Sequence, residues 1–334
     1  MDYNHKLGLY IPTYNRGKFL KELLNQIISQ FSRYNLPIFI SDNGSEDDTL
    51  EIINDARSSY GNIFVRSLPK NLGYAKNFLN VLSEGNTEYC WFFSDDDSLV
   101  QGAVDEIILY LVNNLDFYVV NCSIYDSGMK ELLSPSALPF LTDRSYPPGS
   151  HEQLLTDTKY SHLNGFASAY IIKKCLVDEQ IPLFRNSDQY FLPMILFYRA
   201  IVGRSGTLIS KPLIKNRRGN ESYSAHSIEV WFRYYPQALH SLGDFYSNYS
   251  INTANYGNIE SRFNIQYTYT IQGIFHKNKF DFRSFLRNAA NNYYINLRTK
   301  IILLFISLIP LKVKKIIVSS FFPKYLNLLT PPES

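Results

Sequence analysis

The first 125 residues alternate short apolar runs with longer segments of helical periodicity, and this alternation restricts the possible folds more than any other feature. Between the runs, apolar residues recur every three or four positions, as amphipathic helices require. The strand-like runs are residues 7–11, 38–40, 63–65, 89–93 and 117–120. Strands that alternate with helices form right-handed crossovers and a mostly parallel sheet. We therefore predict an α/β, Rossmann-like fold with a twisted, mostly parallel sheet and flanking helices.

The pattern changes beyond residue 125. Residues 126–165 lose periodicity and gather prolines, which predicts a long loop of the kind that forms lids or binding segments. Further strands are expected at 167–172 and 207–210, on either side of a helix from about Ser187 to Ile201. After Ser224 the pattern is helical and aromatic. The predicted division is a sheet-forming domain 1–224, with halves 1–125 and 126–224, and a helical, aromatic- and basic-rich region 225–334.

Four polar clusters follow directly after predicted strands. They are Pro12-Thr-Tyr-Asn-Arg16, Ser41-Asp-Asn-Gly-Ser45, Asn71-Leu-Gly-Tyr74 and Ser94-Asp-Asp-Asp97. Open parallel sheets bind ligands in the crevice beyond the carboxyl ends of their strands. We therefore expect the four clusters to converge in space although they are far apart in the sequence.

Three adjacent aspartates, Asp95, Asp96 and Asp97, end the fourth strand. Neighbouring carboxylates repel one another, so a cation is a natural way to hold them together. Hard oxygen ligands select Mg²⁺ or Mn²⁺, which usually keep substrate phosphates as further ligands. The alternative is a solvated acidic turn in which Asp97 caps the next helix.

The second and third clusters suit a nucleotide. Asp42 can accept a hydrogen bond from the polar edge of a nucleobase, although Asp-Asn-Gly also forms turns on its own account. Asn71 and Gly73 predict a tight turn before a helix whose free N–H groups suit a phosphate. Ser45, with Asp48 three residues later, predicts the start of the intervening helix.

Charge is distributed unevenly along the chain. The net charge of +3 gives no support to nucleic-acid binding, but residues 282–332 contain no Asp or Glu and eight Lys or Arg. Residues 301–309 are apolar yet shorter than a bilayer span, and three lysines follow within 312–315. This pattern predicts a helix, 298–328, that lies on an anionic membrane surface. The alternative is a helix packed against the sheet-forming domain.

Two features indicate the compartment. The three cysteines, Cys90, Cys122 and Cys175, are odd in number and widely spaced, as in a reducing environment. The first six residues are polar and show no signal peptide. We expect a cytoplasmic protein, peripheral on the inner face of the membrane.

The polar clusters resemble the opening motifs of family 2 glycosyltransferases of GT-A fold, in order and in spacing. The matching segments are IPTYNR at 11–16, SDNGSEDDT at 41–49, NLGYAKN at 71–77 and WFFSDDDSL at 91–99. Within that family, the strand before Ser94, ISKPL at 209–213 and RGNES at 218–222 look most like the abequosyltransferase branch of O-antigen assembly. The resemblance implies a GT-A catalytic domain at 1–224 and sugar transfer from a nucleotide-diphosphate sugar to a lipid-linked oligosaccharide of bacterial lipopolysaccharide. It also implies that transfer is inverting and metal-dependent.

The resemblance also implies a set of site residues. Asp96 and Asp97 would hold the Mg²⁺ or Mn²⁺ ion, although Ser94 replaces the first aspartate of the motif common in the family. Arg217, Arg218 and Ser222 would close over the diphosphate, with a solvated arginine pair as the alternative. The nucleotide-sugar contacts would be Pro12, Thr13, Asn15, Arg16, Asp42, Asn43, Asn71, Gly73, Asn77, Asp95, Arg217, Arg218 and Ser222.

Inverting transfer needs a general base for the acceptor hydroxyl. The family places an acidic residue at the start of a helix after the acceptor loop, and Asp188 matches that place. Its alternative role is a helix N-terminal charge. Asp178 and Glu179 are the nearby alternatives for the base.

Two other functions stay open at this point. One is a sugar-binding protein with the GT-A fold and no turnover, since fold alone does not give function. The other is a synthase that loads a sugar onto polyprenyl phosphate. A processive synthase is disfavoured because no Gln-x-x-Arg-Trp motif occurs.

Overall fold

The computed structural model describes residues 3–159, 161, 163–219, 229–263, 282–290, 297–310, 313 and 316. Three sequence predictions fall outside these residues. They are the role of Ser222, the lysines within 312–315, and the expected membrane helix beyond residue 316.

A ten-stranded sheet has the order β3-β2-β1-β4-β9-β6-β10-β5, with β7 paired to β6 and β8 paired to β10. The first five strands along the chain are β1 (Leu7–Thr13), β2 (Ile38–Asp42), β3 (Ile63–Ser67), β4 (Tyr89–Phe92) and β5 (Ser98–Leu99). The others are β6 (Phe117–Tyr125), β7 (Leu132–Ser134), β8 (Arg144–Tyr146), β9 (Tyr170–Lys173) and β10 (Gly206–Arg217).

Strand direction determines where the site lies. β3, β2, β1 and β4 are parallel neighbours, and β6 is parallel to β10. β9 runs antiparallel to both β4 and β6, so those two strands point the same way. The carboxyl ends of β3, β2, β1, β4, β6 and β10 therefore face one edge of the sheet. The expected α/β sheet is confirmed, with β9 as an antiparallel insertion.

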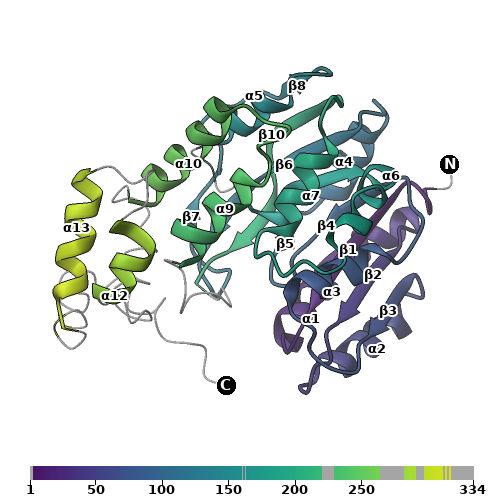
Figure 1. Ribbon diagram of the computed structural model, residues 1–334. Coiled ribbons are helices and arrows are strands. Elements are labelled where there is room, and N and C mark those ends of the chain that lie inside the picture. The colour runs from purple at the N-terminus through teal and green to yellow at the C-terminus, as the bar shows by residue number, and fades with distance from the viewer. Residues whose placement is uncertain are drawn as a thin grey trace.

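Helices flank the sheet (Figure 1). Those of the first 200 residues are α1 (Gly17–Phe31), α2 (Thr49–Ser59), α3 (Tyr74–Leu82), α4 (Ala103–Leu111), α5 (His151–Asp157), α6 (Lys174–Asp178) and α7 (Leu192–Ala200). Short helical turns are η1 (Ser32–Tyr34), η2 (Ala167–Ala169) and η3 (Ile181–Phe184). In α1, for example, Leu20, Leu23, Leu24 and Ile27 recur at helical spacing and all are buried. Burial of this face drives the helix onto its neighbours.

Several predicted boundaries were wrong. α2 starts after Asp48, because the hydroxyl of Ser45 donates to the carboxylate of Asp42 instead of capping the helix. α7 starts at Leu192 and not near Ser187, and Pro193 suits that first turn because it needs no N–H partner there.

The region 126–165 is not a structureless loop, since it contains β7, β8 and α5. The predicted strand at 167–172 opens with the turn η2. The strand predicted at 207–210 continues to Arg217, and its register against β6 shifts around Pro212, which has no N–H to donate.

The described residues from Glu229 onward are mainly helical. They form η5 (Val230–Tyr234), α9 (Tyr235–His240), α10 (Asn248–Phe263), α12 (Phe282–Phe285), η7 (Leu286–Ala290) and α13 (Leu297–Leu308). α10 packs on α5 and α9, whereas α13 packs on α12 and η7, at the end of the molecule away from β2 and β3 (Figure 1). Within the described segments no helix is both long and apolar enough to cross a bilayer.

Candidate active site

The polar clusters converge on one cavity of about 420 Å³ at the carboxyl edge of the sheet. This volume lies in the range of small-molecule sites. Among the predicted site residues, those that line it are Pro12, Thr13, Arg16, Asn43, Asn71, Gly73, Asn77, Asp95, Asp96, Asp97, Arg217 and Arg218. Asn15, Asp42 and Asp188 lie outside this lining.

Asp42 is held firmly at the end of β2. Its side chain is 2% exposed, and its Oδ1 accepts hydrogen bonds from the backbone N–H of Ser45 at 3.1 Å and from the Ser45 hydroxyl at 2.5 Å. Asn15 ties the same loop to β1, because its N–H donates to Ser45 and its Oδ1 accepts from the N–H of Glu46. Asn15 therefore shapes the loop, and the base-reading role of Asp42 stays a prediction.

Asn43 joins this loop to the turn before α3. Its Nδ2 donates to Asn71 Oδ1 at 2.9 Å, and its Oδ1 accepts from the N–H of Leu72 at 2.9 Å. Gly73 adopts a φ of 88° immediately before α3, a conformation that favours glycine. Gly44 approaches the backbone of Lys70 so closely that a Cβ would lie 2.8 Å from it. The two loops are therefore packed as one unit.

Asn77 supports the unit from α3. Its Nδ2 donates to the carbonyls of Thr13 and Ser41, both at 3.1 Å, and its Oδ1 accepts from the Ser41 hydroxyl at 2.7 Å. These bonds fix the ends of β1 and β2. The predicted contact of Asn77 with the donor stays a prediction.

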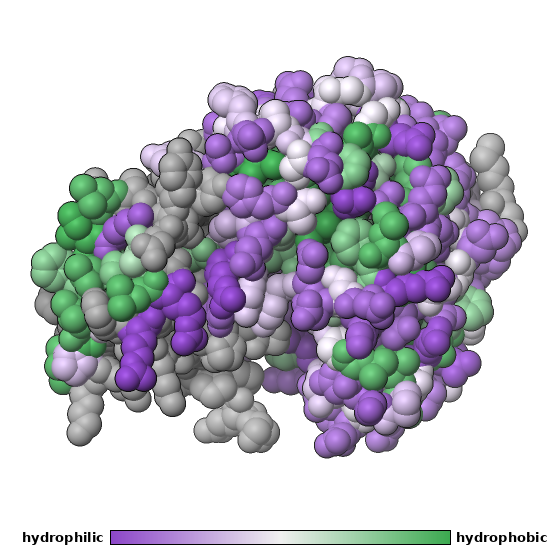
Figure 2. All heavy atoms as spheres, in the orientation of Figure 1, coloured by the Kyte–Doolittle hydropathy of each residue, from purple (hydrophilic) through white to green (hydrophobic). Residues whose placement is uncertain are grey.

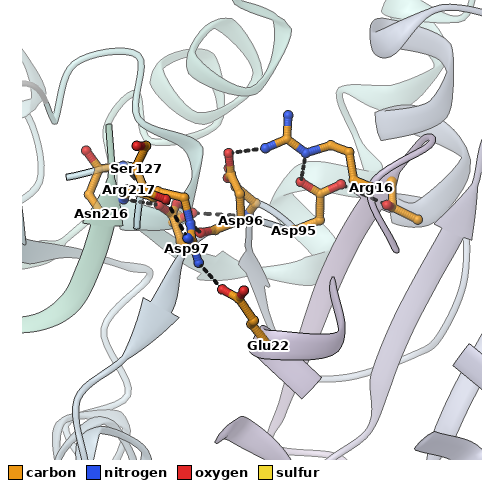
Figure 3. Close-up of polar contacts among 11 residues, drawn as sticks. Arg16, Glu22, Asp95, Asp96, Asp97, Ser127, Asn216 and Arg217 are labelled. Carbon is orange, nitrogen blue, oxygen red and sulfur yellow. Dashed lines mark hydrogen bonds and ion pairs between the residues drawn. The ribbon is translucent and has the colours of Figure 1, made fainter. Parts of the chain in front are cut away.

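The first two aspartates of the acidic turn face Arg16 (Figure 3). Asp95 accepts from the Thr13 hydroxyl at 2.8 Å, and its Oδ1 lies 3.0 Å from Arg16 Nε. Asp96 accepts a short hydrogen bond from Arg16 Nη2. Burial and the charge of Asp96 raise the pKa of Asp95, although Arg16 and Thr13 oppose the shift.

Asp97 turns the other way. Its carboxylate accepts from the Ser168 hydroxyl at 2.6 Å, from Asn216 Nδ2 at 2.9 Å and from the N–H of Arg217 at 3.2 Å. Burial, followed by the charge of Asp96, raises the pKa of Asp97 despite these bonds. Ser168 also accepts from the N–H of Ser94, so one hydroxyl holds both ends of the turn.

The carboxylates of the acidic turn therefore face two directions. Asp95 and Asp96 face the guanidinium of Arg16, while Asp97 faces Ser168 and Asn216. Among the described residues, no group of three or more His, Cys, Asp or Glu side chains is arranged to hold a metal. In this structure the guanidinium of Arg16 supplies the positive charge beside Asp95 and Asp96. Asp96, whose side chain is 18% exposed, and Asp97 both line the cavity.

Arg217 connects distant parts of the molecule. Its guanidinium donates to the carbonyl of Asp96 at 2.8 Å, to the carbonyl of Ser127 at 2.8 Å and to Glu22 Oε2 at 2.6 Å (Figure 3). The residue is 6% exposed, so the idea of a solvated side chain is wrong for Arg217. It fixes the acidic turn against α1.

An aromatic wall was missed by the sequence reasoning. Tyr190, Phe191 and Trp231 line the cavity together with Phe166. Tyr190 stacks on Tyr234 with ring centroids 5.3 Å apart, and Phe191 contacts Trp231 at 5.1 Å. The aromatic composition after Ser224 was a signal for Trp231 alone, because Phe166, Tyr190 and Phe191 precede that segment. Their place depends on long-range packing, which local periodicity does not reveal.

Comparison with known proteins now identifies the family. Residues 9–175 match the family model described as glycosyl transferase family 2. This chain belongs to glycosyl transferase family 2. It is therefore an enzyme that transfers glycosyl groups, and its sequence resemblance to this family is confirmed.

Relatives refine this assignment. Abequosyltransferase RfbV of Salmonella typhimurium is 32% identical over 264 residues, which are 74% of this chain and 78% of the relative. The resemblance to the abequosyltransferase branch is thus confirmed. A GalNAc(5)-diNAcBac-PP-undecaprenol beta-1,3-glucosyltransferase of Campylobacter jejuni is 29% identical over 125 residues, which are 37% of this chain and 40% of the relative.

A solved structure supports the fold. The mannosyltransferase PcManGT of Pyrobaculum calidifontis, in complex with GDP-Man and Mn²⁺, superposes with a TM-score of 0.55 and 11% identity. The match covers 97% of this chain and 84% of that one. At this identity the similarity establishes the GT-A fold alone.

Proposed function

We propose that this glycosyltransferase moves a sugar from a nucleoside-diphosphate sugar to a lipid-linked oligosaccharide during assembly of a bacterial O-antigen or related surface polysaccharide. The observation that carries the proposal is the single cavity into which the strand-end clusters and the acidic turn converge. One relative is named as an abequosyltransferase, and another is named for a glycan on a PP-undecaprenol carrier. We also propose 1–224 as the catalytic domain and 225–334 as a distinct helical region.

The donor fits the half of the cavity formed by β1, β2 and α3. Among the described residues, both hydrogen bonds to the Asp42 carboxylate go to Oδ1. We therefore assign Oδ2 to the polar edge of the nucleobase. The turn 71–73 presents the N-terminus of α3 to the cavity, and N–H groups at such ends attract phosphate. Arg16 and Arg218 add positive charge to the same lining.

Asp96 and Asp97 fit the role of metal ligands, with Mg²⁺ or Mn²⁺ as the ion. A carboxylate has about four acceptor positions, and three donors engage Asp97 among the described residues. Burial is the main cause of the raised pKa values of Asp95 and Asp97, and the charge of Asp96 adds to it, so a cation beside them would favour the ionised carboxylates. When bound, the ion would stabilise the charge that develops on the departing diphosphate. The relative in fold from Pyrobaculum calidifontis was solved with GDP-Man and Mn²⁺.

The acceptor fits the aromatic wall of the same cavity. Rings such as Tyr190, which is 44% exposed, offer an apolar face to a sugar. We assign the general base to Asp188, which lies two residues before Tyr190, and expect inversion at the transferred carbon. Glu229, which precedes the cavity-lining Val230 and Trp231, is the alternative that the structure adds to Asp178 and Glu179.

A lipid-linked acceptor requires access to a membrane, and α13 offers a suitable face. Leu297, Ile301, Phe305 and Leu308 lie along one side of this helix and are 46–73% exposed, whereas Leu303 on the other side is buried. Apolar side chains of α13 cover the left edge of the molecule in Figure 2. No acidic residue occurs in 282–332. We propose that this end lies on the anionic, cytoplasmic face of the inner membrane, and that the enzyme is peripheral there.

The test is direct binding and transfer. Purified protein is titrated calorimetrically with UDP-, GDP-, CDP- and dTDP-sugars in the presence of Mn²⁺, and the donor that binds is then incubated with a lipid-linked glycan extract. We expect one nucleotide class to bind and its labelled sugar to enter the lipid fraction. Asp42→Ala should lower the affinity for that donor by about 10- to 150-fold, since one charge-assisted hydrogen bond is lost. Asp55→Asn, an exposed change on α2, is the matched control.

Each competing function predicts a different product. A polyprenyl-phosphate sugar synthase would yield a monosaccharide on the lipid, with no need for a preformed glycan. A sugar-binding protein without turnover would bind the donor and neither hydrolyse nor transfer it. Equal donor affinity in Asp42→Ala and wild type would place the nucleotide elsewhere.

A further inference from the structure

The guanidinium of Arg16 supplies positive charge beside Asp95 and Asp96, where a divalent metal ion would also bind. Its guanidinium bridges Asp95 and Asp96, with Nε 3.0 Å from Asp95 Oδ1 and Nη2 donating to Asp96 Oδ2. The side chain is 19% exposed and lies 4.8 Å from the ring centroid of Phe19. The guanidinium of Arg217 lies 5.0 Å from the centroid of the same ring, but it contacts Glu22 and two backbone carbonyls.

We propose that Arg16 is an exchangeable counter-ion of the acidic turn. It holds Asp95 and Asp96 in the empty enzyme, and it releases Asp96 when a divalent ion binds there with the donor diphosphate. The inference rests on the proposed metal role of Asp96 and Asp97. It adds that metal and nucleotide bind cooperatively because both act on the same arginine.

The physical reason is competition between two cations for one carboxylate. A divalent ion and a guanidinium that share Asp96 lie within a few ångströms of each other and repel strongly in a partly buried site. Arginine suits carboxylate and phosphate equally well, because its planar fork pairs with two oxygens of either. The diphosphate can therefore accept hydrogen bonds from Arg16 in place of the Arg16–Asp96 hydrogen bond.

Two consequences distinguish this exchange from a fixed ion pair. Metal alone binds weakly, because it has to break the Arg16–Asp96 contact without compensation. A nucleoside diphosphate that accepts Arg16 strengthens metal binding, and by linkage the metal strengthens nucleotide binding by the same factor.

The experiment measures Mn²⁺ binding by the loss of its free electron-paramagnetic-resonance signal, with and without the nucleoside diphosphate of the matching donor, after subtraction of the Mn²⁺ that the nucleotide binds without protein. Arg16→Gln should bind Mn²⁺ alone about tenfold or more tighter than wild type, the scale of one charge-assisted contact. Lys18→Gln removes the same charge from an exposed position on α1 and should shift the affinity by less than about threefold, since solvent and salt screen it. Nucleotide should strengthen Mn²⁺ binding strongly in wild type and much less in Arg16→Gln.

Two further variants make every result decisive. Adding Asp96→Asn to Arg16→Gln should remove the tight Mn²⁺ site, which locates it at the acidic turn. If Arg16→Gln does not fold, Arg16→Lys should still raise the affinity, because lysine cannot bridge both carboxylates as a fork. Equal Mn²⁺ affinity in wild type, Arg16→Gln and Arg16→Lys refutes the exchange alone. Absence of Mn²⁺ binding in all of them, with or without nucleotide, refutes the proposed metal site as well.

Discussion

At the residue scale, Ser168 shows how a buried hydroxyl organises a charged site. It has no exposed surface, accepts from the N–H of Ser94 at 3.0 Å and donates to Asp97 at 2.6 Å. Its carbonyl accepts from the indole of Trp91 at 2.8 Å. The acidic turn is thus attached to the strand that precedes it and to β9, which follows η2. Ser168 positions the carboxylate of Asp97, and its local sequence does not predict that role.

Asp188 is the residue whose assignment most needs a kinetic test. The structure places it in an exposed segment four residues before α7, so it is not the helix N-terminal charge that the sequence allowed as an alternative. Its neighbours Tyr190 and Phe191 reach the cavity.

Asp188→Asn should lower kcat by about 10²- to 10⁴-fold, the usual contribution of a general base, while donor affinity stays unchanged. The pH profile of kcat should also lose its acidic limb. Since the side chain is exposed, the fold should be unaffected. Glu229→Gln, Asp178→Asn and Glu179→Gln are the comparison variants. A wild-type rate in Asp188→Asn, with loss of transfer in one of these, would move the base to that residue.

At the element scale, the sequence predicted the strands and helices whose faces are amphipathic or uniformly apolar. β1 to β4 and the helices between them lie within a few residues of their predicted positions. The convergence of the strand-end clusters was also predictable, because it follows from parallel strand direction alone.

Long-range pairing was not predictable in the same way. The antiparallel place of β9 between β4 and β6, and the extension of β10, depend on partners far away in the chain. Arg217 and Glu22, which form an ion pair, are 195 residues apart. A periodic pattern identifies an element and its buried face, but it does not specify which other element receives that face.

Asp116, at the amino-terminal end of β6, also contacts residues that are far away in the sequence. Its carboxylate accepts from the N–H and hydroxyl of Ser205, both at 3.0 Å, and from Lys173 Nζ at 3.2 Å. It thereby joins the start of β6 to the end of β9 and to the residue before β10. Partial burial pushes the pKa of Asp116 up, but the hydrogen bonds together outweigh it, so the pKa is lowered.

Asp116→Ala should therefore reduce the free energy of unfolding by about 1–3 kcal/mol at pH 7. The unfolded carboxyl has a pKa of about 3.9 and the folded one a lower value, so the unfolded state binds more protons between them. The stabilisation is present above about pH 4 and is lost as the pH falls through the folded pKa. Urea unfolding from pH 7 to pH 3 measures this as a shrinking difference from wild type. Asp244→Ala, at an exposed position, is the control, and a difference independent of pH would contradict the assigned charge effect.

At the scale of the whole molecule, the enzyme has a cavity at the edge of the sheet and, separately, an exposed apolar face on α13. The cavity lies at the carboxyl edge of the sheet, and α13 lies at the end of the molecule away from β2 and β3 (Figure 1). A glycan on a lipid carrier needs both, since its sugar has to reach the cavity while its lipid stays in the bilayer. A peripheral attachment at α13 would keep the cavity close to the surface on which such acceptors are held.

The final prediction tests that attachment. Ile301→Ser combined with Phe305→Ser removes two exposed apolar side chains from α13 and leaves its buried face intact. Wild type should sediment with vesicles that contain phosphatidylglycerol, and the double variant should bind about tenfold or more weakly, since interfacial burial of each side chain is lost. Raised salt should weaken wild-type binding further, because it screens the basic C-terminal region. Leu109→Ser combined with Val112→Ser, at exposed apolar positions on and just after α4, is the matched control and should sediment like wild type. If this control detaches and the α13 variant does not, the membrane-facing surface lies on the sheet domain instead.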